Sequence, residues 1–339
     1  MATTGTSTGI LPPEHWATQK PAYDKDATDC DSVDESTASL TSSIYKYRTI
    51  HGRTYHAERG DAQYWASNDQ RQGESLDINH HCCTLALGGK LHMAPLSKDI
   101  KNALDVGTGT GIWAIDFADQ YTKATVTGTD ITPIQPTFVP PNVKFEIEDC
   151  NTEWTFACNH FDFVHMRWMI GSIVDWDKLF VRAYAHIKPG GWLETYEMSA
   201  IIESDNGTVS DESALGQWGK IFIEGGRKLG VSFEVVQNDL QRKAMKAAGF
   251  VDIQVKDIKM PIGGWPKNKD LKEQGLFARA VLEQDPEGYI LFMTGTLGWS
   301  REQVLTYVAR IHKEVRSGKH HAYYRQRVVW GQKPGVSGS

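Results

Sequence analysis

The chain has 339 residues, of which 40% are hydrophobic, and this suffices to bury the core of one α/β domain with elaborations. Its formal net charge of -6, without a run of lysine or arginine, argues against general electrostatic binding to nucleic acid or to an anionic membrane. No stretch reaches the roughly eighteen apolar residues of a membrane helix, and residues 1–5 lack the basic and apolar regions of a signal peptide.

Cysteine usage is typical of reduced thiols in the cytosol, because the number is odd and no spacing suggests pairs. The cysteines are Cys30, Cys82, Cys83, Cys150 and Cys158. The run 80–83, His-His-Cys-Cys, resembles a metal site, but four consecutive side chains diverge on a helix or strand and cannot converge on one ion. We expect packing roles for this run, no metal, and a cytoplasmic protein, with the nucleus as the alternative.

The N-terminal part divides into two segments. Residues 1–40 are rich in Thr, Ser, Asp and Ala and hold too little apolar material to offset the entropy of ordering, so we predict a disordered leader. From residue 42 to 93, aromatic and aliphatic residues recur among polar ones in a helical pattern. Residues 41–98 are therefore predicted to form a helical segment ahead of the first strand of the sheet.

Short apolar strands then alternate with segments of helical periodicity, which predicts a parallel sheet with right-handed crossovers. The strands are expected near residues 103–106, 125–131, 143–148, 161–166 and 191–198, with helices between them. Among these helices, the segment 175–187 has the clearest apolar period.

The pattern changes after residue 198. Helices are predicted at 217–229 and 239–248, and strands at 252–260 and 327–331 are suited to an antiparallel hairpin that closes the sheet. The long connection between these strands carries two helical patterns, so we expect a helical insertion over about 267–320 that builds a substrate-pocket wall or a dimer contact, with core packing as the alternative. The domain is expected to span 99–334, followed by a tail at 335–339.

A glycine turn follows the first strand of the predicted sheet. Gly107, Gly109 and Gly111 are spaced G-x-G-x-G, with Ile112 where a dinucleotide-binding turn would place its last glycine. Asp105, two residues ahead, would be unfavourable beside a diphosphate but suits the ammonium group of an amino-acid-bearing cofactor. Both features favour S-adenosylmethionine over a nicotinamide dinucleotide.

These residues resemble the first motif of the class I S-adenosylmethionine-dependent methyltransferases, and four further motifs follow in the order of that family. The resemblance implies a Rossmann-like, seven-stranded α/β sheet, with S-adenosyl-L-methionine as cofactor, S-adenosyl-L-homocysteine as product, and no metal. The cofactor-binding residues it implies are Asp105, Gly107, Thr108, Gly109, Gly111, Asp130, Ile131, Asp149, Cys150 and Asn151. Among them, Asp130 ends the second strand and matches the acid that holds the ribose.

More narrowly, segments over about residues 40–334 resemble the LaeA-like branch of fungal methyltransferases of secondary metabolism. Among them are 45–47, 51–56, 68–69, 77–81, 165–167 and 171–176. This resemblance makes the helical N-terminal segment a lid over the cofactor mouth and implies Tyr45, Tyr55 and His56 as lid residues. It leaves two functions open: O-methylation of a carboxylate or hydroxyl on a small-molecule metabolite, and a regulatory role in a nuclear complex.

Three residues are candidates for chemistry at the acceptor. His165, at the carboxyl end of the fourth strand, suits a general base, with a hydrogen-bonded core group or a cofactor contact as the alternative. Arg167 suits a clamp on a substrate carboxylate, with a structural salt bridge as the alternative. Glu197, near the end of the fifth strand, is expected to face the pocket and orient a donor. The expected partner is a small-molecule substrate; a homodimer and a regulatory protein partner are alternatives, and direct binding to nucleic acid or membrane is not expected.

Overall fold

The computed structural model describes residues 9–17, 46–57 and 64–335. Its centre is a seven-stranded sheet in the order β5-β4-β3-β6-β7-β9-β8. The strands are β3 (Asn102–Val106), β4 (Thr125–Asp130), β5 (Val143–Ile147), β6 (Phe161–Arg167), β7 (Ile187–Glu203), β8 (Val251–Pro261) and β9 (Tyr323–Gln332). The first five run parallel, whereas β9 lies antiparallel between β7 and β8. The predicted Rossmann-like sheet is confirmed.

The strand order reverses between β3 and β6. The chain proceeds outward from β3 through β4 to β5 and then returns to place β6 on the other side of β3. At such a switch point the connections leave in opposite directions, so a crevice opens beyond the carboxyl ends of the two strands. The fold therefore specifies where a ligand site belongs before any side chain is considered.

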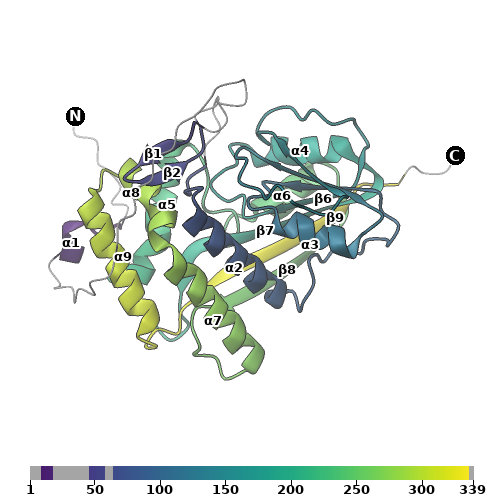
Figure 1. Ribbon diagram of the computed structural model, residues 1–339. Helices are drawn as coiled ribbons and strands as arrows, with labels where there is room; N and C mark the ends of the chain where they lie inside the picture. Colours follow the sequence, from purple (N-terminus) through teal and green to yellow (C-terminus); the bar gives the residue numbers. More distant parts are fainter. Residues whose placement is uncertain (1–8, 18–45, 58–63, 336–339) are drawn as a thin grey trace, which may run out of the picture.

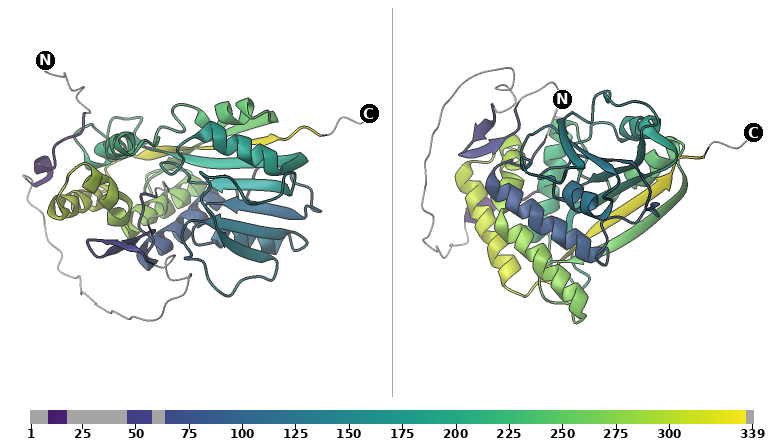
Figure 2. Two further views of the ribbon diagram at one scale, coloured as in Figure 1. Left: turned by 90° about the horizontal axis from the view of Figure 1, so that it is seen from above. Right: turned by 45° about the vertical axis from the view of Figure 1, so that its right-hand side comes forward.

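Helices cover both faces of the sheet (Figure 2). Helices α2 (Gln70–Ala86) and α3 (Ile112–Gln120) lie on one face, and α4 (Trp176–His186) and α6 (Leu240–Ala247) lie on the other, while α5 (Ala214–Leu229) packs against β7. The prediction of helices in every crossover was wrong for two of them, because residues 131–142 and 148–160 connect their strands without a helix. The prolines at 133, 136, 140 and 141 explain the first of these, since proline removes the backbone donors that a helix needs.

The N-terminal segment contains a β-hairpin that the helical pattern did not predict. Strands β1 (Arg48–Ile50) and β2 (Arg53–Tyr55) pair antiparallel across a two-residue turn. His51 and Gly52 have φ of 51° and 81°, which is the left-handed pair that a tight hairpin turn requires. Among the described residues of this region, α2 alone supplies the predicted helix.

Part of the predicted leader is docked on the domain. Residues 14–17 form the short helix α1 (Glu14–Ala17), and Trp16 is 3% exposed because its ring packs against Tyr307 at 5.0 Å. The backbone N–H of Leu11 donates to Gln217 Oε1 at 2.8 Å. The remainder of the predicted leader lies outside the described residues.

Three helices fill the connection between β8 and β9. They are α7 (Lys269–Gln284), α8 (Pro286–Thr296) and α9 (Arg301–Arg316), and α7 runs beside α2 (Figure 1). The two predicted helical patterns correspond to α7 and α9. Helix α8 is buried on nearly all sides, so its sequence lacks the polar face that creates a helical period. None of the helices among the described residues is long and apolar enough to cross a membrane.

A buried ion-pair network joins the hairpin to both α2 and the insertion. The Arg53 guanidinium donates to Asp69 at 2.5 and 2.8 Å and to Asp285 at 2.8 and 2.5 Å. Asp69 caps the first turn of α2, and Asp285 caps the first turn of α8. Burial alone would lower the pKa of Arg53, but the two carboxylates outweigh that effect and raise it.

Candidate functional site

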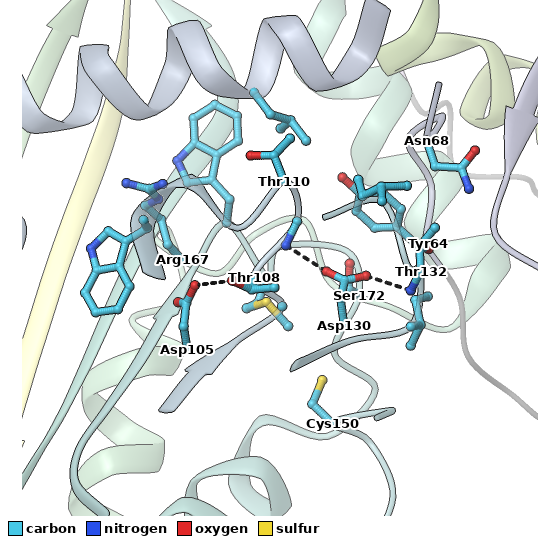
Figure 3. A pocket seen from close by; sticks show the side chains of 18 of the residues that line it. Tyr64, Asn68, Asp105, Thr108, Thr110, Asp130, Thr132, Cys150, Arg167 and Ser172 are labelled. Atoms are coloured by element: carbon cyan, nitrogen blue, oxygen red, sulfur yellow. Dashed lines mark hydrogen bonds between the residues drawn. The ribbon is translucent and has the colours of Figure 1, made fainter. Parts of the chain in front are cut away.

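A cavity lies at the switch point, beyond the carboxyl ends of β3, β4 and β6 and beneath α2 (Figure 3). Its empty space, including the open mouth, is about 1150 Å³. Most of the cofactor residues implied by the resemblance line it. These are Asp105, Gly107, Thr108, Gly109, Asp130, Ile131, Asp149, Cys150 and Asn151. Gly111 is absent from the lining but shapes the turn that carries the others.

The turn after β3 requires glycine for two physical reasons. Gly107 and Gly111 have φ of 67° and 82°, in the left-handed region that side-chain-bearing residues avoid. A Cβ on Gly107 would lie 2.4 Å from Met169 Sδ, and one on Gly111 would lie 2.4 Å from Phe145 Cζ. Gly111 is also the N-cap of α3, so the turn delivers the backbone directly into the helix. The result is a close-packed loop whose backbone borders the cavity.

Asp130 anchors this loop to the end of β4. One carboxylate oxygen accepts from the backbone N–H of Gly109 at 2.9 Å, and the other accepts from that of Thr132 at 3.0 Å (Figure 3). Burial raises the pKa of Asp130 to about 6, against the lowering effect of these N–H donors. Each carboxylate oxygen has two lone pairs, so each can accept one further donor from the cavity. Two adjacent hydroxyl groups of a ribose match that requirement.

Asp105 and His165 form a buried pair at the floor of the site. Asp105 accepts from Thr108 Oγ1 at 2.6 Å and from His165 Nδ1 at 2.7 Å. His165 is 1% exposed, and its ring stacks on Trp113 with centroids 3.7 Å apart and planes 3° from parallel. Burial lowers the pKa of His165, although the hydrogen bond to Asp105 opposes this. The imidazole is thus neutral and fixed, with Nδ1 as the protonated nitrogen.

Arg167 belongs to a chain of contacts that links β6 to α2 and α3. Its Nη2 donates to His80 Nδ1 at 3.0 Å, and His80 Nε2 lies 2.9 Å from Asp116. Because arginine only donates, His80 Nδ1 must be unprotonated and Nε2–H must donate to Asp116. Burial, reinforced by Arg167, lowers the pKa of His80 to about 4, which agrees with a neutral ring. Arg167 also lines the cavity, where it is the single cationic side chain among the described lining residues.

The segment after β5 supplies another part of the wall. Asn151 donates from its backbone N–H to Asp149 Oδ1 at 2.9 Å and from its side chain to Ser172 O at 3.0 Å. The second bond joins the segment that follows β5 to the segment that follows β6. Cys150 is half-buried between them, and its desolvation raises the pKa of the thiol, so it lines the site as a neutral group.

Glu197 lies behind the cavity wall and does not line it. It is fully buried, and its two oxygens accept from the backbone N–H groups of Met169 and Ile170, each at 3.0 Å. Burial raises the pKa of Glu197 to about 8, and the two N–H donors lower it only in part. This carboxyl group therefore fixes the segment that follows β6, in place of the predicted role of facing the pocket.

The lid residues implied by the resemblance fall elsewhere. Tyr45 lies outside the described residues. Tyr55 is buried against Phe292, with ring centroids 5.8 Å apart, and does not line the cavity. His56 lies behind the wall, where its Nε2 accepts from the backbone N–H of Tyr64 at 3.2 Å.

Other residues of the same segment line the cavity instead. Tyr64, Asn68 and Gln72 line the cavity from the loop before α2 and from its first turn, and Figure 3 shows Tyr64 on the opposite side of Thr108 from Arg167. The sequence signal that could have located these residues is Asp69, because aspartate is a favourable N-cap and marks the N-terminus of a helix beside them.

The cavity fits the cofactor that the motifs imply. Asn68 is 8% exposed, and neither the oxygen nor the nitrogen of its buried side-chain amide bonds to any described residue. A buried amide without partners is costly unless a ligand or water satisfies it, which indicates a polar occupant. Together with the free lone pairs of Asp130 and the exposed backbone of the glycine turn, this donor and acceptor set suits an adenosyl group that carries an amino acid.

Comparisons with known proteins agree with this site. Residues 79–255 match the model of a methyltransferase domain family. The chain is 36% identical to methyltransferase pytC of Aspergillus terreus over 92% of this chain and 95% of that one. It is 32% identical to secondary metabolism regulator LAE1 of Cochliobolus heterostrophus (84% and 94% covered) and 32% identical to probable methyltransferase tdiE of Emericella nidulans (89% and 93%). The chain therefore belongs to the class I S-adenosylmethionine-dependent methyltransferases, in the LaeA-like branch of fungal secondary metabolism.

Proposed function

We propose that this methyltransferase transfers a methyl group to an oxygen atom of a small-molecule metabolite, and that the acceptor oxygen belongs to a carboxylate. The observation that carries the proposal is the contrast between two cavity residues: Arg167 presents a cation, while His165 is 1% exposed and its ring is covered by Trp113. An ionised carboxylate needs no base at neutral pH, whereas a phenol of pKa near 10 benefits from one.

The cofactor residues hold the donor in this proposal. Asp130 accepts from the ribose hydroxyls, the turn from Gly107 to Gly111 borders the amino-acid end, and the segment 149–151 borders the adenine. When bound, S-adenosylmethionine supplies an electrophilic methyl group. The work of the protein is then to align the acceptor and to exclude water, as expected for an in-line displacement.

His165 takes a positioning role in this scheme. Its Nδ1–H holds Asp105, which in turn holds Thr108 within the glycine turn. Among the described residues that line the cavity, Asp149 and Glu148 accept from neighbouring backbone N–H groups, and desolvation raises the pKa of the Cys150 thiol. Arg167 is held on one side by His80 and directs its remaining donors toward the acceptor carboxylate.

The first experiment is calorimetric titration of the protein with S-adenosylmethionine and with S-adenosylhomocysteine. We expect Asp130→Ala to weaken the binding of both ligands by about 10- to 100-fold, since hydrogen bonds to a charged group contribute about 1.5–3 kcal/mol. Asp119→Ala, an exposed aspartate on α3, is the matched control and should bind as the wild type does. Equal binding by both variants would contradict the assigned ribose site.

The second experiment identifies the acceptor oxygen. A panel of aromatic acids and phenols is incubated with the cofactor and analysed for a mass gain of one methyl group. We expect methyl esters, which mild alkali hydrolyses, and a rise in KM for the acid in Arg167→Ala. Methylation confined to phenols would contradict the carboxylate proposal, and no product across the panel from a protein that binds the cofactor would contradict small-molecule O-methylation.

A regulatory function is the second candidate, supported by the 32% identity to secondary metabolism regulator LAE1 of Cochliobolus heterostrophus. It predicts a stable complex with a protein partner and cofactor binding without small-molecule turnover. Affinity purification of the tagged full chain from its native cells, followed by mass spectrometry, distinguishes the two candidates when combined with the acceptor panel.

A further inference from the structure

We propose that a second, aromatic cavity next to the cofactor site holds the body of the methyl acceptor, and that this body is an uncharged fused-ring aromatic group. The inference rests on the proposed function, because it assigns the substrate class of the same reaction. The cavity contains about 570 Å³ of empty space, including its opening to solvent.

The second cavity is built where the sheet, α5 and the insertion meet. Ala200 of β7 lies in one wall, Trp218 of α5 in another, and Ala278 of α7 together with Tyr289 of α8 in a third. The insertion, which the sequence predicted as a pocket wall, a dimer contact or plain core packing, therefore contributes directly to this wall.

Its lining indicates the chemistry of the ligand. Seven of the sixteen lining side chains are aromatic, eight are aliphatic, and the remaining one is Ser199; none carries a charge. A charged ligand body would lose its hydration here without compensation, so the body must be neutral. Aromatic walls favour a planar ring system, because offset stacking and edge-to-face contacts add to the burial of apolar area.

The wall is held in place before any ligand binds. Trp65 Nε1 donates to Ile170 O at 2.8 Å, which fixes the indole plane. The same ring makes edge-to-face contacts with the rings of Phe222 and Phe233, with ring centroids 5.2 and 5.6 Å apart. A preorganised aromatic pocket loses little entropy when a rigid ring enters it.

The second cavity adjoins the cofactor cavity. Trp168 lines both cavities, and its neighbours divide between them, with Met169 in the first and Ile170 in the second. Glu197 holds this dividing segment through the N–H groups of residues 169 and 170. A ring system in the second cavity thus places its substituent at the border, next to the cavity that contains Arg167.

The test uses the full chain saturated with S-adenosylhomocysteine, titrated by calorimetry with 2-naphthoic acid and with decanoic acid. Ala200→Leu and Ala278→Leu fill the cavity from two different elements, β7 and α7, and Ala280→Leu on the same helix as Ala278 is the control outside the lining. We expect wild type and control to bind naphthoic acid more tightly than decanoic acid, and each filling variant to bind it at least 10-fold more weakly. Binding of S-adenosylhomocysteine within about 2-fold of wild type shows that a variant is folded.

An enlarging variant gives a second readout if the filling variants do not fold. Leu282→Ala removes a partly buried side chain from the lining and should shift preference toward anthracene-2-carboxylic acid. Filling variants that bind naphthoic acid as the wild type does, an unchanged preference in Leu282→Ala, or tighter binding of decanoic acid would each overturn the proposal.

Turnover separates this proposal from the proposed function. Cavity-dependent binding without methylation of any acid leaves the binding site in place and contradicts the O-methylation. Methylation that the filling variants do not slow supports the O-methylation and contradicts the acceptor cavity.

Discussion

The ion-pair network around Arg53 allows a quantitative prediction about how the N-terminal hairpin is attached to α2 and to the insertion. Its side chain is 10% exposed and bonds to Asp285, whose side chain is 0% exposed, and to Asp69. In Arg53→Ala, Asp285 keeps the backbone N–H of Gly288 at 3.0 Å but loses its buried cation. Removing one partner of a buried pair costs about 3–5 kcal/mol, because the remaining charge is left in a poorly solvating environment.

A neighbouring arginine provides the control. Arg71 Nε lies 3.4 Å from the Asp285 carboxylate, but the Arg71 side chain is 49% exposed. Arg71→Ala should therefore lower the free energy of unfolding by less than about 1 kcal/mol. Urea unfolding at pH 7 measures both. With a slope of about 3 kcal/mol per molar, Arg53→Ala should lower the midpoint by about 1–1.7 M. Equal shifts in the two variants would refute the reasoning that burial of Asp285 sets the cost.

Three further predictions concern the turn and its buried acids. Gly298→Ala places its Cβ in open space at a φ of 85° and should lower the free energy of unfolding by about 1 kcal/mol, through backbone strain alone. Gly111→Ala has a similar φ of 82° but places its Cβ 2.4 Å from Phe145 Cζ, so thermal unfolding should show a further loss of about 1–3 kcal/mol. Affinity for S-adenosylhomocysteine should fall as pH drops below about 6, where Asp130 becomes protonated, and calorimetry of Asp130→Asn should lack this dependence. The pKa of Glu197 is raised to about 8 in the folded protein from about 4.5 in the unfolded chain, so protonation stabilises the folded form and the free energy of unfolding falls as pH rises between these values. When the free energy of unfolding is measured from pH 5 to 7.5, its fall with pH should be smaller in Glu197→Gln than in the wild type, by up to about 1.4 kcal/mol per pH unit. An unchanged pH dependence in this variant would contradict the assignment.

The residues that the sequence located well are those set by backbone geometry. The glycine turn and Asp130 follow strands whose apolar runs are unmistakable, so their place at the switch point followed from the topology. Helix α8 and the hairpin at β1 and β2 escaped prediction for opposite reasons. The first is buried on nearly all sides and shows no period, while the second is signalled only by the short pair of His51 and Gly52.

Glu197 illustrates why side-chain roles were harder to predict than strand positions. Its predecessor Tyr196 pairs with Arg167, which is the last residue of β6. The chain then leaves the sheet, so the N–H groups of Met169 and Ile170 have no strand partner, and Glu197 satisfies them. This depends on where a neighbouring strand ends, which a pattern within one strand does not report. Tyr55 and His56 depend similarly on contacts with distant elements.

The separation of the two cavities has an evolutionary consequence. The walls of the cofactor cavity come from residues 64–172, whereas much of the second cavity comes from residues 198–324, including the insertion. Substitutions in α7 and α8 can therefore accumulate without altering the glycine turn or Asp130. A lineage built on this chain can acquire a different preferred metabolite through the insertion while inheriting its methyl-donor site unchanged.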